Sequence, residues 1–309
     1  MARTVLITGV AGFLGRYVAR QFARDGWSVV GVDTAPPENA GLGPGARYRR
    51  MVLPSVDLRP LLADVAPDAC VHCAGRASVA LSITEPAADF RDNVALTFEL
   101  LEALRCTAPH CRFLFLSSAA VYGDPVSLPV TEEHACAPLS PYGWHKRQCE
   151  LLCEEFARIY RLPTAVVRIF SAYGPGLRRQ VIWDICAKAL TNPALELRGT
   201  GDESRDFIHA ADVARALAVL ADNAAFTGEI YNLASSEETT ISHLAKHLLA
   251  LVRRDIPITF DGARSAGDPL HWRADITRLR RLGFAPEISL EQGARSVAAW
   301  CSAELGQTQ

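Results

Sequence analysis

The sequence has no apolar run that approaches the ~20 residues a helix needs to cross a bilayer. Its first residues lead directly into a strand pattern, without the charged, apolar and cleavage regions of a signal peptide. Acidic and basic residues nearly cancel, with a formal net charge of −2, so no whole-chain positive field favours nucleic acid or an anionic membrane. We therefore expect a cytoplasmic protein that binds neither nucleic acid nor membrane.

Complete metal-binding and disulfide patterns are missing as well. The nine cysteines are odd in number and several lie in apolar runs, as expected of reduced, buried thiols. Cys70 and Cys73 form a CxxC pair, but the pair lies in a strand-like run and no second pair follows. His243 and His247 have the spacing of a zinc-protease helix, but Leu244 stands where that motif requires Glu. The sequence thus predicts no metal site.

Lysine is scarce: Lys146, Lys188 and Lys246 are the only lysines among 32 basic residues. Lys146 follows Tyr142 by four residues in a predicted helix, so the two side chains reach the same point. A phenol with a reference pKa near ~10 is a poor base at neutral pH, but a nearby ammonium favours the phenolate. Arginine titrates too high to be such a tunable partner. The pair therefore indicates a proton acceptor for an alcohol, with an ordinary helix face as the alternative.

The N-terminal residues have a pattern typical of dinucleotide binding. Thr4–Thr8 is an apolar, β-branched run that predicts a buried strand, and it leads into a turn with Gly9, Gly12 and Gly15. A helix and a second strand ending at Asp33 follow. Glycines let backbone N–H groups approach a pyrophosphate at the helix N-terminus. An acid at the second strand's end accepts hydrogen bonds from both ribose hydroxyls and repels a 2′-phosphate, which favours NAD over NADP.

The fold class predicted from the pattern is α/β. Strands alternate with helices through the first half, as in a Rossmann-type doubly wound parallel sheet. We expect an NAD-binding domain over residues 1–170, to which residues 206–233 return, and a smaller C-terminal α/β substrate domain over 171–309. We also expect a loop over Asn39–Arg50 and one long amphipathic helix over Pro86–Leu104.

Small and hydroxyl residues follow two of the predicted strands. Arg112–Leu116 is a strand pattern that ends in Ser117 and Ser118. Ligands of open parallel sheets bind at the carboxyl ends of the strands, so Ser118 is placed for chemistry, with a solvated turn serine as the alternative. Ala74 and Gly75 follow another strand, and such small residues let the backbone approach a cofactor.

Further motifs complete this picture over essentially the whole chain. They are Thr8-Gly9-x-x-Gly12-x-x-Gly15, Asp33, Asp57-Leu58, His72-Cys73-Ala74-Gly75, Asn93, Ser117-Ser118-Ala119-Ala120-Val121-Tyr122-Gly123, Tyr142-x-x-x-Lys146, Arg168-Ile169-Phe170-Ser171-Ala172-Tyr173-Gly174-Pro175-Gly176 and Arg205-Asp206-Phe207-Ile208-His209. Together they resemble the extended short-chain dehydrogenase/reductases, specifically the NAD-dependent nucleotide-sugar epimerase/dehydratase family. Within that family the chain looks most like the UDP-glucose/galactose 4-epimerases.

The resemblance implies NAD as the cofactor, a nucleotide sugar as the substrate, and roles for individual residues. The implied catalytic residues are Ser118, Tyr142 and Lys146. The implied cofactor-binding residues are Gly9, Gly12, Phe13, Leu14, Gly15, Asp33, Asp57, Leu58, Ala74, Gly75, Asn93, Ser117, Tyr142 and Lys146. The implied substrate-binding residues are Ser118, Ser171, Arg179, Arg205 and Arg264. Of these, Arg179 follows a Gly-Pro-Gly loop and Arg205 would meet the substrate diphosphate.

The chain also departs from the family pattern. Many relatives have Asn where Ser171 stands, and the 4,6-dehydratases have Asp-Glu where this chain has Ala119 and Ala120. Without a carboxyl pair the elimination of water lacks its proton donor and acceptor, which argues against a dehydratase. Arg264 lies four residues before Asp268, where the family spacing is three.

The leading hypothesis is an NAD-dependent nucleotide-sugar 4-epimerase, with a UDP-sugar favoured, that oxidises C4 transiently and re-reduces it on the other face. The alternative is an NAD(P)H-dependent 4-ketoreductase of an NDP-4-keto-6-deoxy sugar. A third hypothesis, a non-catalytic NAD-binding protein, is disfavoured because Tyr142 and Lys146 are both present. The resemblance also implies a homodimer in which helices near Pro86–Leu104 and Tyr142–Tyr160 pair as a four-helix bundle.

Overall fold

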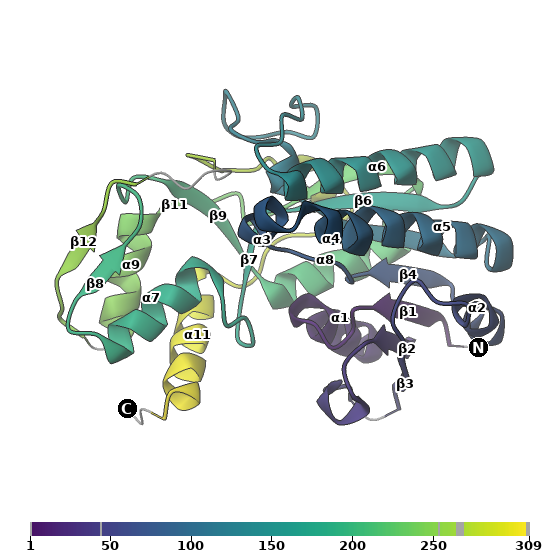
Figure 1. The fold of residues 1–309 in the computed structure, drawn as a ribbon, viewed down its shortest axis with the longest axis horizontal. Helices are drawn as coiled ribbons and strands as arrows, with labels where there is room; N and C mark the ends of the chain where they lie inside the picture. The colour runs from purple at the N-terminus through teal and green to yellow at the C-terminus, as the bar shows by residue number, and fades with distance from the viewer. Residues whose placement is uncertain (1, 44, 253, 264–268, 307–309) are drawn as a thin grey trace.

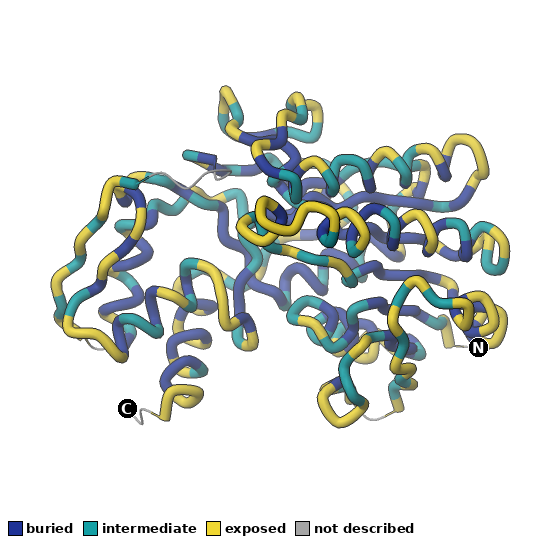
Figure 2. The backbone as a smooth tube through the Cα atoms, in the orientation of Figure 1, coloured by how far each residue is buried: buried dark blue, intermediate teal, exposed yellow. Residues whose placement is uncertain are grey.

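The computed structural model describes residues 2–43, 45–252, 254–263 and 269–306. Its larger part is a seven-stranded parallel sheet with strand order β10-β6-β5-β4-β1-β2-β3 (Figure 1). The strands are β1 (Thr4–Thr8), β2 (Ser28–Asp33), β3 (Arg47–Arg50), β4 (Ala69–His72), β5 (Arg112–Ser118), β6 (Thr164–Ile169) and β10 (Thr227–Leu233). The central strands are continuous apolar runs because helices cover both faces, and they are buried in Figure 2. The predicted doubly wound sheet is confirmed.

Helices cover the sheet in two layers (Figure 1). On one face α1 (Phe13–Arg24) packs against α8 (Ala210–Asn223), and α10 (Thr277–Arg281) adds Leu279 to their core. On the other face α2 (Leu58–Val65), α5 (Leu96–Thr107) and α6 (Pro141–Tyr160) enclose a second core. Each layer buries one apolar stripe per helix against the strands, which fixes α6 beside β5 and β6.

A smaller part of the fold has its own apolar core. Its helices are α7 (Gln180–Thr191), α9 (Ile241–Leu251) and α11 (Leu290–Glu304), and its two-stranded sheet pairs β8 (Leu195–Leu197) with β12 (Ile258–Phe260). A three-stranded sheet orders β11 (Glu238–Thr240), β9 (Ser204–His209) and β7 (Ser171–Tyr173). The strand β7 follows β6 directly, so the chain passes from the large sheet into this part at Phe170. The predicted domain boundaries stay a prediction.

Two sequence-based expectations for secondary structure were wrong. The stretch Asn39–Arg50 is not all loop, because its last four residues form β3, paired in parallel with β2 at the sheet edge. The stretch Pro86–Leu104 is not one α-helix: α3 (Val79–Thr84) precedes α4 (Pro86–Phe90), and a π-helical turn, Arg91–Ala95, joins α4 to α5. Within that turn the Nδ2 of Asn93 donates to the carbonyl oxygen of Asp89 at 3.0 Å. The side chain thus takes the oxygen that an α-helix offers to the backbone N–H of the same residue.

Within the described ranges, no helix combines the length and the apolar character needed to cross a bilayer.

Candidate active site

A cleft of about 1250 Å³ lies where the carboxyl ends of β1, β4, β5 and β6 face the smaller part of the fold. Its walls come from the turns after these strands on one side and from residues 197–207 and 269–272 on the other. Clefts at the carboxyl ends of parallel strands are where open α/β sheets bind ligands. The volume exceeds that of a pocket for one small molecule, so the cleft has room for two ligands side by side.

The helix α6 brings Tyr142 and Lys146 to this cleft. It begins after Ser140, whose Oγ accepts from the Gly143 N–H at 3.2 Å, and Pro141 occupies its first position. Tyr142 therefore lies in the first turn and Lys146 one turn later, and both line the cleft. The Lys146 side chain is buried, with its Nζ donating to the Leu116 carbonyl oxygen at 3.0 Å and lying 5.9 Å from the centroid of the Tyr142 ring.

The two serines at the end of β5 point in different directions, as strand alternation requires. Ser118 lines the cleft and is half-buried, and its Oγ accepts from the Ala120 N–H at 3.2 Å. Ser117 is buried, and its Oγ donates to Oε1 of Glu150 on α6 at 2.6 Å. The hydroxyl hydrogen of Ser117 is thus donated to Glu150, and the predicted contact of this residue with the cofactor stays a prediction.

The turn after β1 has the backbone features of a phosphate site. Gly9 has φ +67°, and a Cβ there would lie 2.6 Å from the Ala74 nitrogen, so only glycine fits. The helix α1 begins after Gly12 with no side chain capping its first N–H groups, which leaves these donors available to an anion. Asp33, at the end of β2, accepts from the Ala11 N–H at 2.9 Å and so holds the turn in place.

A second close approach occurs after β4. Gly75 has φ +127°, and a Cβ there would lie 2.7 Å from Oδ1 of the buried Asn93. Ala74 and Gly75 both line the cleft. His72, which closes β4, also lines it and was not predicted as a site residue from the sequence. A histidine at the end of an apolar strand run was the available signal.

The ring of His72 is buried between two threonines. Its Nδ1 lies 2.6 Å from Thr8 Oγ1 and its Nε2 lies 3.3 Å from Thr97 Oγ1. Burial, together with the nearby Lys146 ammonium, lowers the pKa of His72 to about 3. His72 is therefore neutral at physiological pH and carries no charge into the site.

The structure brings some predicted site residues to the cleft and leaves others outside its lining. Those that line the cleft are Gly12, Phe13, Leu14, Ala74, Gly75, Ser117, Ser118, Tyr142, Lys146, Ser171, Arg179 and Arg205. Those that do not are Gly9, Gly15, Asp33, Asp57, Leu58 and Asn93. Gly9 and Asp33 support the turn after β1, Gly9 through its close approach to Ala74 and Asp33 by accepting from the Ala11 N–H. The side chain of Leu58, on α2, is buried in the apolar core. Arg264 lies outside the described residues.

Arginines enrich the half of the cleft that faces the smaller part of the fold. Arg179, the residue before α7, donates to the Ala77 carbonyl oxygen after β4, and both residues line the cleft. Arg205 donates to the carbonyl oxygens of Ser204 at 2.8 Å and Leu270 at 3.3 Å. Arg198, which the sequence did not single out, lines this half of the cleft too, whereas Arg76 lines the opposite wall after β4 and pairs with Glu85 at 2.5 Å and Asp92 at 2.7 Å. This concentration of guanidinium groups suits a phosphorylated ligand.

The carboxyl groups of the cleft lining are all engaged. Asp124 accepts from the Leu270 N–H at 3.0 Å, and Asp184 pairs with Lys188 at 2.9 Å. Glu203 accepts from the N–H groups of Thr200 and Gly201. Asp124, Asp184 and Glu203 are the acidic residues of the described lining, and no two of them form a pair. In the part of the chain that the structure describes, no cluster of His, Cys, Asp and Glu could hold a metal ion.

Comparison with known proteins gives a consistent picture. Residues 5–234 match the sequence model of the NAD dependent epimerase/dehydratase family. A UDP-glucose 4-epimerase of Mycolicibacterium smegmatis is 29% identical over 301 residues, covering 93% of this chain and 95% of the relative. The dTDP-glucose 4,6-dehydratase 1 of Escherichia coli is 31% identical over 334 residues, covering 96% of this chain and 92% of the relative.

The fold as a whole is also shared with a solved enzyme. The crystal structure of a UDP-glucose 4-epimerase with UDP-glucose from Thermotoga maritima superimposes with a TM-score of 0.88 at 28% identity. The superposition covers 98% of this chain and 99% of that one. The cleft described above therefore occurs within a fold that this relative shares over nearly its entire length.

Proposed function

Because the chain belongs to the NAD-dependent epimerase/dehydratase family, we propose that it is a 4-epimerase of a UDP-sugar. The observation that carries the proposal is the meeting of Tyr142 and Lys146 on α6 with Ser118 of β5 in one cleft. Residues of the glycine turn after β1 and several arginines also line that cleft, so a dinucleotide and a phosphorylated sugar fit side by side.

The residues around the cleft fit NAD, the cofactor of this family. The uncapped N–H groups of α1 suit its pyrophosphate, and the missing Cβ of Gly9 keeps this turn tight against Ala74. Asp33 presents a carboxylate for the adenosine ribose, where a 2′-phosphate would meet a like charge. When bound, NAD supplies the acceptor and donor of hydride for C4 of the sugar.

The protein's own part in the reaction is proton transfer and positioning. Tyr142, as phenolate, takes the proton of the 4-hydroxyl group and later returns it. Lys146, held by the Leu116 carbonyl, places its ammonium nitrogen 5.9 Å from the centroid of the Tyr142 ring. Ser118 donates to the sugar oxygen that becomes a ketone. The arginines hold the diphosphate while the 4-keto hexose turns over in the wide cleft and presents its other face.

The cleft argues against a 4,6-dehydratase, although one relative carries that name. Elimination of water needs an acid and a base next to the reacting carbons. Ala119 is buried and Ala120 lines the cleft where the dehydratase pattern has its carboxyl pair. The carboxyl groups of Asp124 and Glu203 are each occupied by backbone N–H groups.

The proposal is tested by cofactor content and by Tyr142→Phe. We expect near-stoichiometric NAD in acid extracts of dialysed protein, and conversion of UDP-glucose to UDP-galactose. Tyr142→Phe should keep its NAD and lose roughly 10²–10⁴-fold in kcat. Tyr160→Phe, the same change at the far end of α6, is the control and should retain turnover. Full turnover by Tyr142→Phe would overturn the mechanism, and stoichiometric consumption of NAD(P)H would replace the epimerase by a 4-ketoreductase.

We further propose that the protein is a cytoplasmic homodimer whose helices pair as a four-helix bundle. Large apolar side chains are exposed along α3, α4, α5 and α6: Leu81, Ile83, Phe90, Phe98, Trp144, Leu151, Ile159 and Tyr160. The helices α5 and α6 lie side by side on one face of the sheet (Figure 1). Apolar surface concentrated on adjacent helices supports a partner, and a second copy related by twofold symmetry would cover both helices at once.

A further inference from the structure

Glu150 is a buried carboxylate on the helix that carries Tyr142 and Lys146. Its residue is 2% exposed, and its oxygens accept hydrogen bonds from three side chains. Arg168 donates to it through Nε at 2.9 Å and Nη2 at 2.7 Å, Arg147 donates at 2.9 Å, and Ser117 donates at 2.6 Å. Glu150 is therefore attached to both neighbouring strands, through Ser117 to β5 and through Arg168 to β6.

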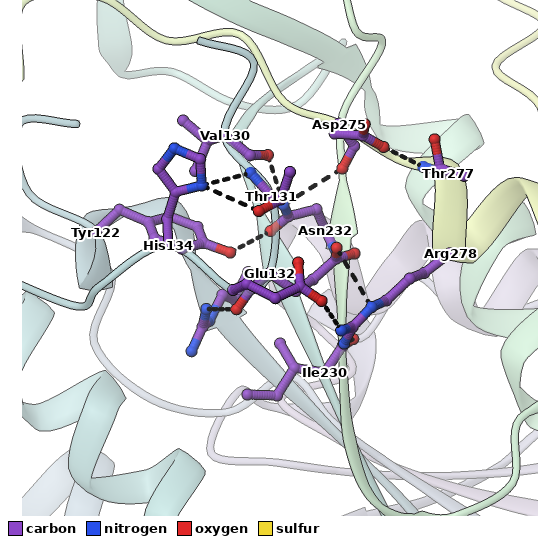
Figure 3. Close-up of polar contacts among 12 residues, drawn as sticks. Tyr122, Val130, Thr131, Glu132, His134, Ile230, Asn232, Asp275, Thr277 and Arg278 are labelled. Carbon is purple, nitrogen blue, oxygen red and sulfur yellow. Dashed lines mark hydrogen bonds and ion pairs between the residues drawn. The ribbon is translucent and has the colours of Figure 1, made fainter. Parts of the chain in front are cut away.

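Arg168 in turn is anchored beyond Glu150. It is 1% exposed, its Nη1 donates to the Glu132 carbonyl oxygen at 3.4 Å, and its guanidinium carbon lies 4.6 Å from the centroid of the Tyr122 ring. The Oη of Tyr122 donates to Asn232 on β10 at 2.7 Å (Figure 3). The pair is thus part of a network that links α6 to β10 and to the loop before α6.

Stability alone does not account for such a pair. Desolvation of two buried ions offsets most of their attraction, and an apolar pair of the same volume stabilises a core equally well or better. A bidentate ion pair also fixes the relative orientation of the two side chains, because the planar guanidinium donates two parallel hydrogen bonds to the carboxylate. Glu150 is therefore held at one position on β6, and α6 is held with it.

The orientation of Glu150 matters because Tyr142 and Lys146 lie on the same face of α6. Tyr142, Lys146 and Glu150 are spaced four residues apart, so they follow one side of α6. Lys146 donates to the Leu116 carbonyl at 3.0 Å, and one turn later Glu150 accepts from Ser117. The helix is thus attached to consecutive residues of β5 at two points. A slip of one residue would move it by about 1.5 Å and turn it by roughly 100°.

We propose that Glu150 is a positioning residue of the epimerase. Held by Arg168, it fixes the rotation and register of α6 on β5 through Ser117, so that Tyr142 and Lys146 face Ser118. The role rests on the proposed function for its effect on turnover. It also assigns Ser117 a task other than contact with the cofactor, namely to join the strand that carries Ser118 to the helix that carries the base.

Two variants test the attachment of Glu150 to Ser117, and they disturb the buried ion pair to different extents. Glu150→Gln keeps the shape but removes the charge, whereas Ser117→Ala removes one hydrogen bond and leaves the ion pair intact. We expect kcat per NAD-bearing subunit to fall roughly 10- to 100-fold in both variants, with KM and NAD content unchanged, because small displacements of reacting groups are that costly. Ser117→Thr retains a hydroxyl and should recover turnover relative to Ser117→Ala.

The matched control is Asp212→Asn. Asp212 is another fully buried carboxylate, paired with Arg215 at 2.7 Å and accepting from the Ile288 N–H at 2.9 Å, on the other face of the sheet. Its loss should lower the free energy of unfolding without changing kcat per NAD-bearing subunit. Equal loss of kcat in Asp212→Asn and Ser117→Ala would overturn the positioning role.

A second measurement does not depend on the substrate. Amide hydrogen exchange of residues 142–146 should be faster in Glu150→Gln and Ser117→Ala than in Asp212→Asn, because α6 then keeps only one of its two attachments to β5, that of Lys146 to Leu116. Unchanged exchange in this segment would overturn the inference even if turnover fell. Conversely, a wild-type protein that epimerises no UDP-sugar would overturn the proposed function, while faster exchange would still support the attachment.

Discussion

The ammonium nitrogen of Lys146 lies 3.0 Å from the carbonyl oxygen of Leu116, inside the sheet-facing side of α6. This bond holds the lysine where its charge can act on Tyr142. Lys146→Met keeps most of the apolar stem and removes the charge and the donor. We expect kcat for the epimerisation of UDP-glucose to fall roughly 10²–10⁴-fold, the range for loss of acid–base assistance.

The control for this change is Lys246→Met. Lys246 is exposed on α9, so its replacement should leave kcat and NAD content as in the wild type. Steady-state kinetics normalised to bound NAD separate a loss of chemistry from a loss of cofactor. A Lys146→Met variant with wild-type kcat would contradict the role given to the ammonium group.

The pairing of Tyr142 with Lys146 could be predicted from the sequence because helical spacing is a local property of the chain. The partner of Ser117 could not, because Glu150 lies 33 residues further on and the contact exists only once α6 packs on β5. Strand alternation indicates that Ser117 and Ser118 face opposite sides, but it does not tell which side holds a buried charge. The resemblance implied that Ser117 binds the cofactor, which stays a prediction, and the structure adds that its hydroxyl donates to Glu150.

The edge strand β3 was missed for a related reason. Its arginines Arg47, Arg49 and Arg50 are exposed, so the segment lacks the apolar run by which the central strands were predicted. An edge strand is paired on one side only, and charged side chains there keep other chains from pairing with it. Its strand conformation depends on β2, a tertiary contact that local composition does not report.

Asp33 should decide between the two nicotinamide cofactors. Asp33→Asn keeps an acceptor for the Ala11 N–H, which Oδ2 now binds at 2.9 Å, but removes the negative charge. Without like-charge repulsion, the affinity for NADP relative to NAD should rise by about tenfold, or about 1.4 kcal/mol. Calorimetric titration of nucleotide-free protein with both cofactors measures the ratio. Asp25→Asn, at the exposed end of α1, should leave it unchanged, and an unaltered ratio in Asp33→Asn would assign the preference elsewhere.

His72 should make the fold sensitive to acid. Burial lowers the pKa of His72 to about 3, whereas an unfolded histidine titrates near ~6.5. Above pH 6.5 neither state binds this proton, so its full contribution to stability is present. Below that pH only the unfolded state binds it, and the free energy of unfolding falls by about 1.4 kcal/mol per pH unit towards pH 3. At pH 5 the loss from this group is about 2 kcal/mol.

The measurement is urea denaturation at pH 7, 6 and 5. His72→Asn retains hydrogen-bonding groups for Thr8 and cannot titrate, so its stability should fall less steeply with acid than that of the wild type, whatever its value at pH 7. His110→Asn removes an exposed histidine and should keep the wild-type slope. If the free energy of unfolding depended on pH equally in the wild type and in His72→Asn, His72 would be protonated in the folded protein as readily as in the unfolded one.

The apolar face of α5 and α6 should hold two copies together. Phe98 on α5 is 42% exposed and Leu151 on α6 is 47% exposed. In a twofold interface each substitution occurs twice on self-complementary surfaces, so Phe98→Glu or Leu151→Glu introduces two buried charges with no partners. We expect both variants to sediment as monomers at concentrations where the wild type is a dimer. Val126→Glu, at a fully exposed loop position, should remain dimeric, and a wild type that stays monomeric at every concentration would refute the four-helix bundle.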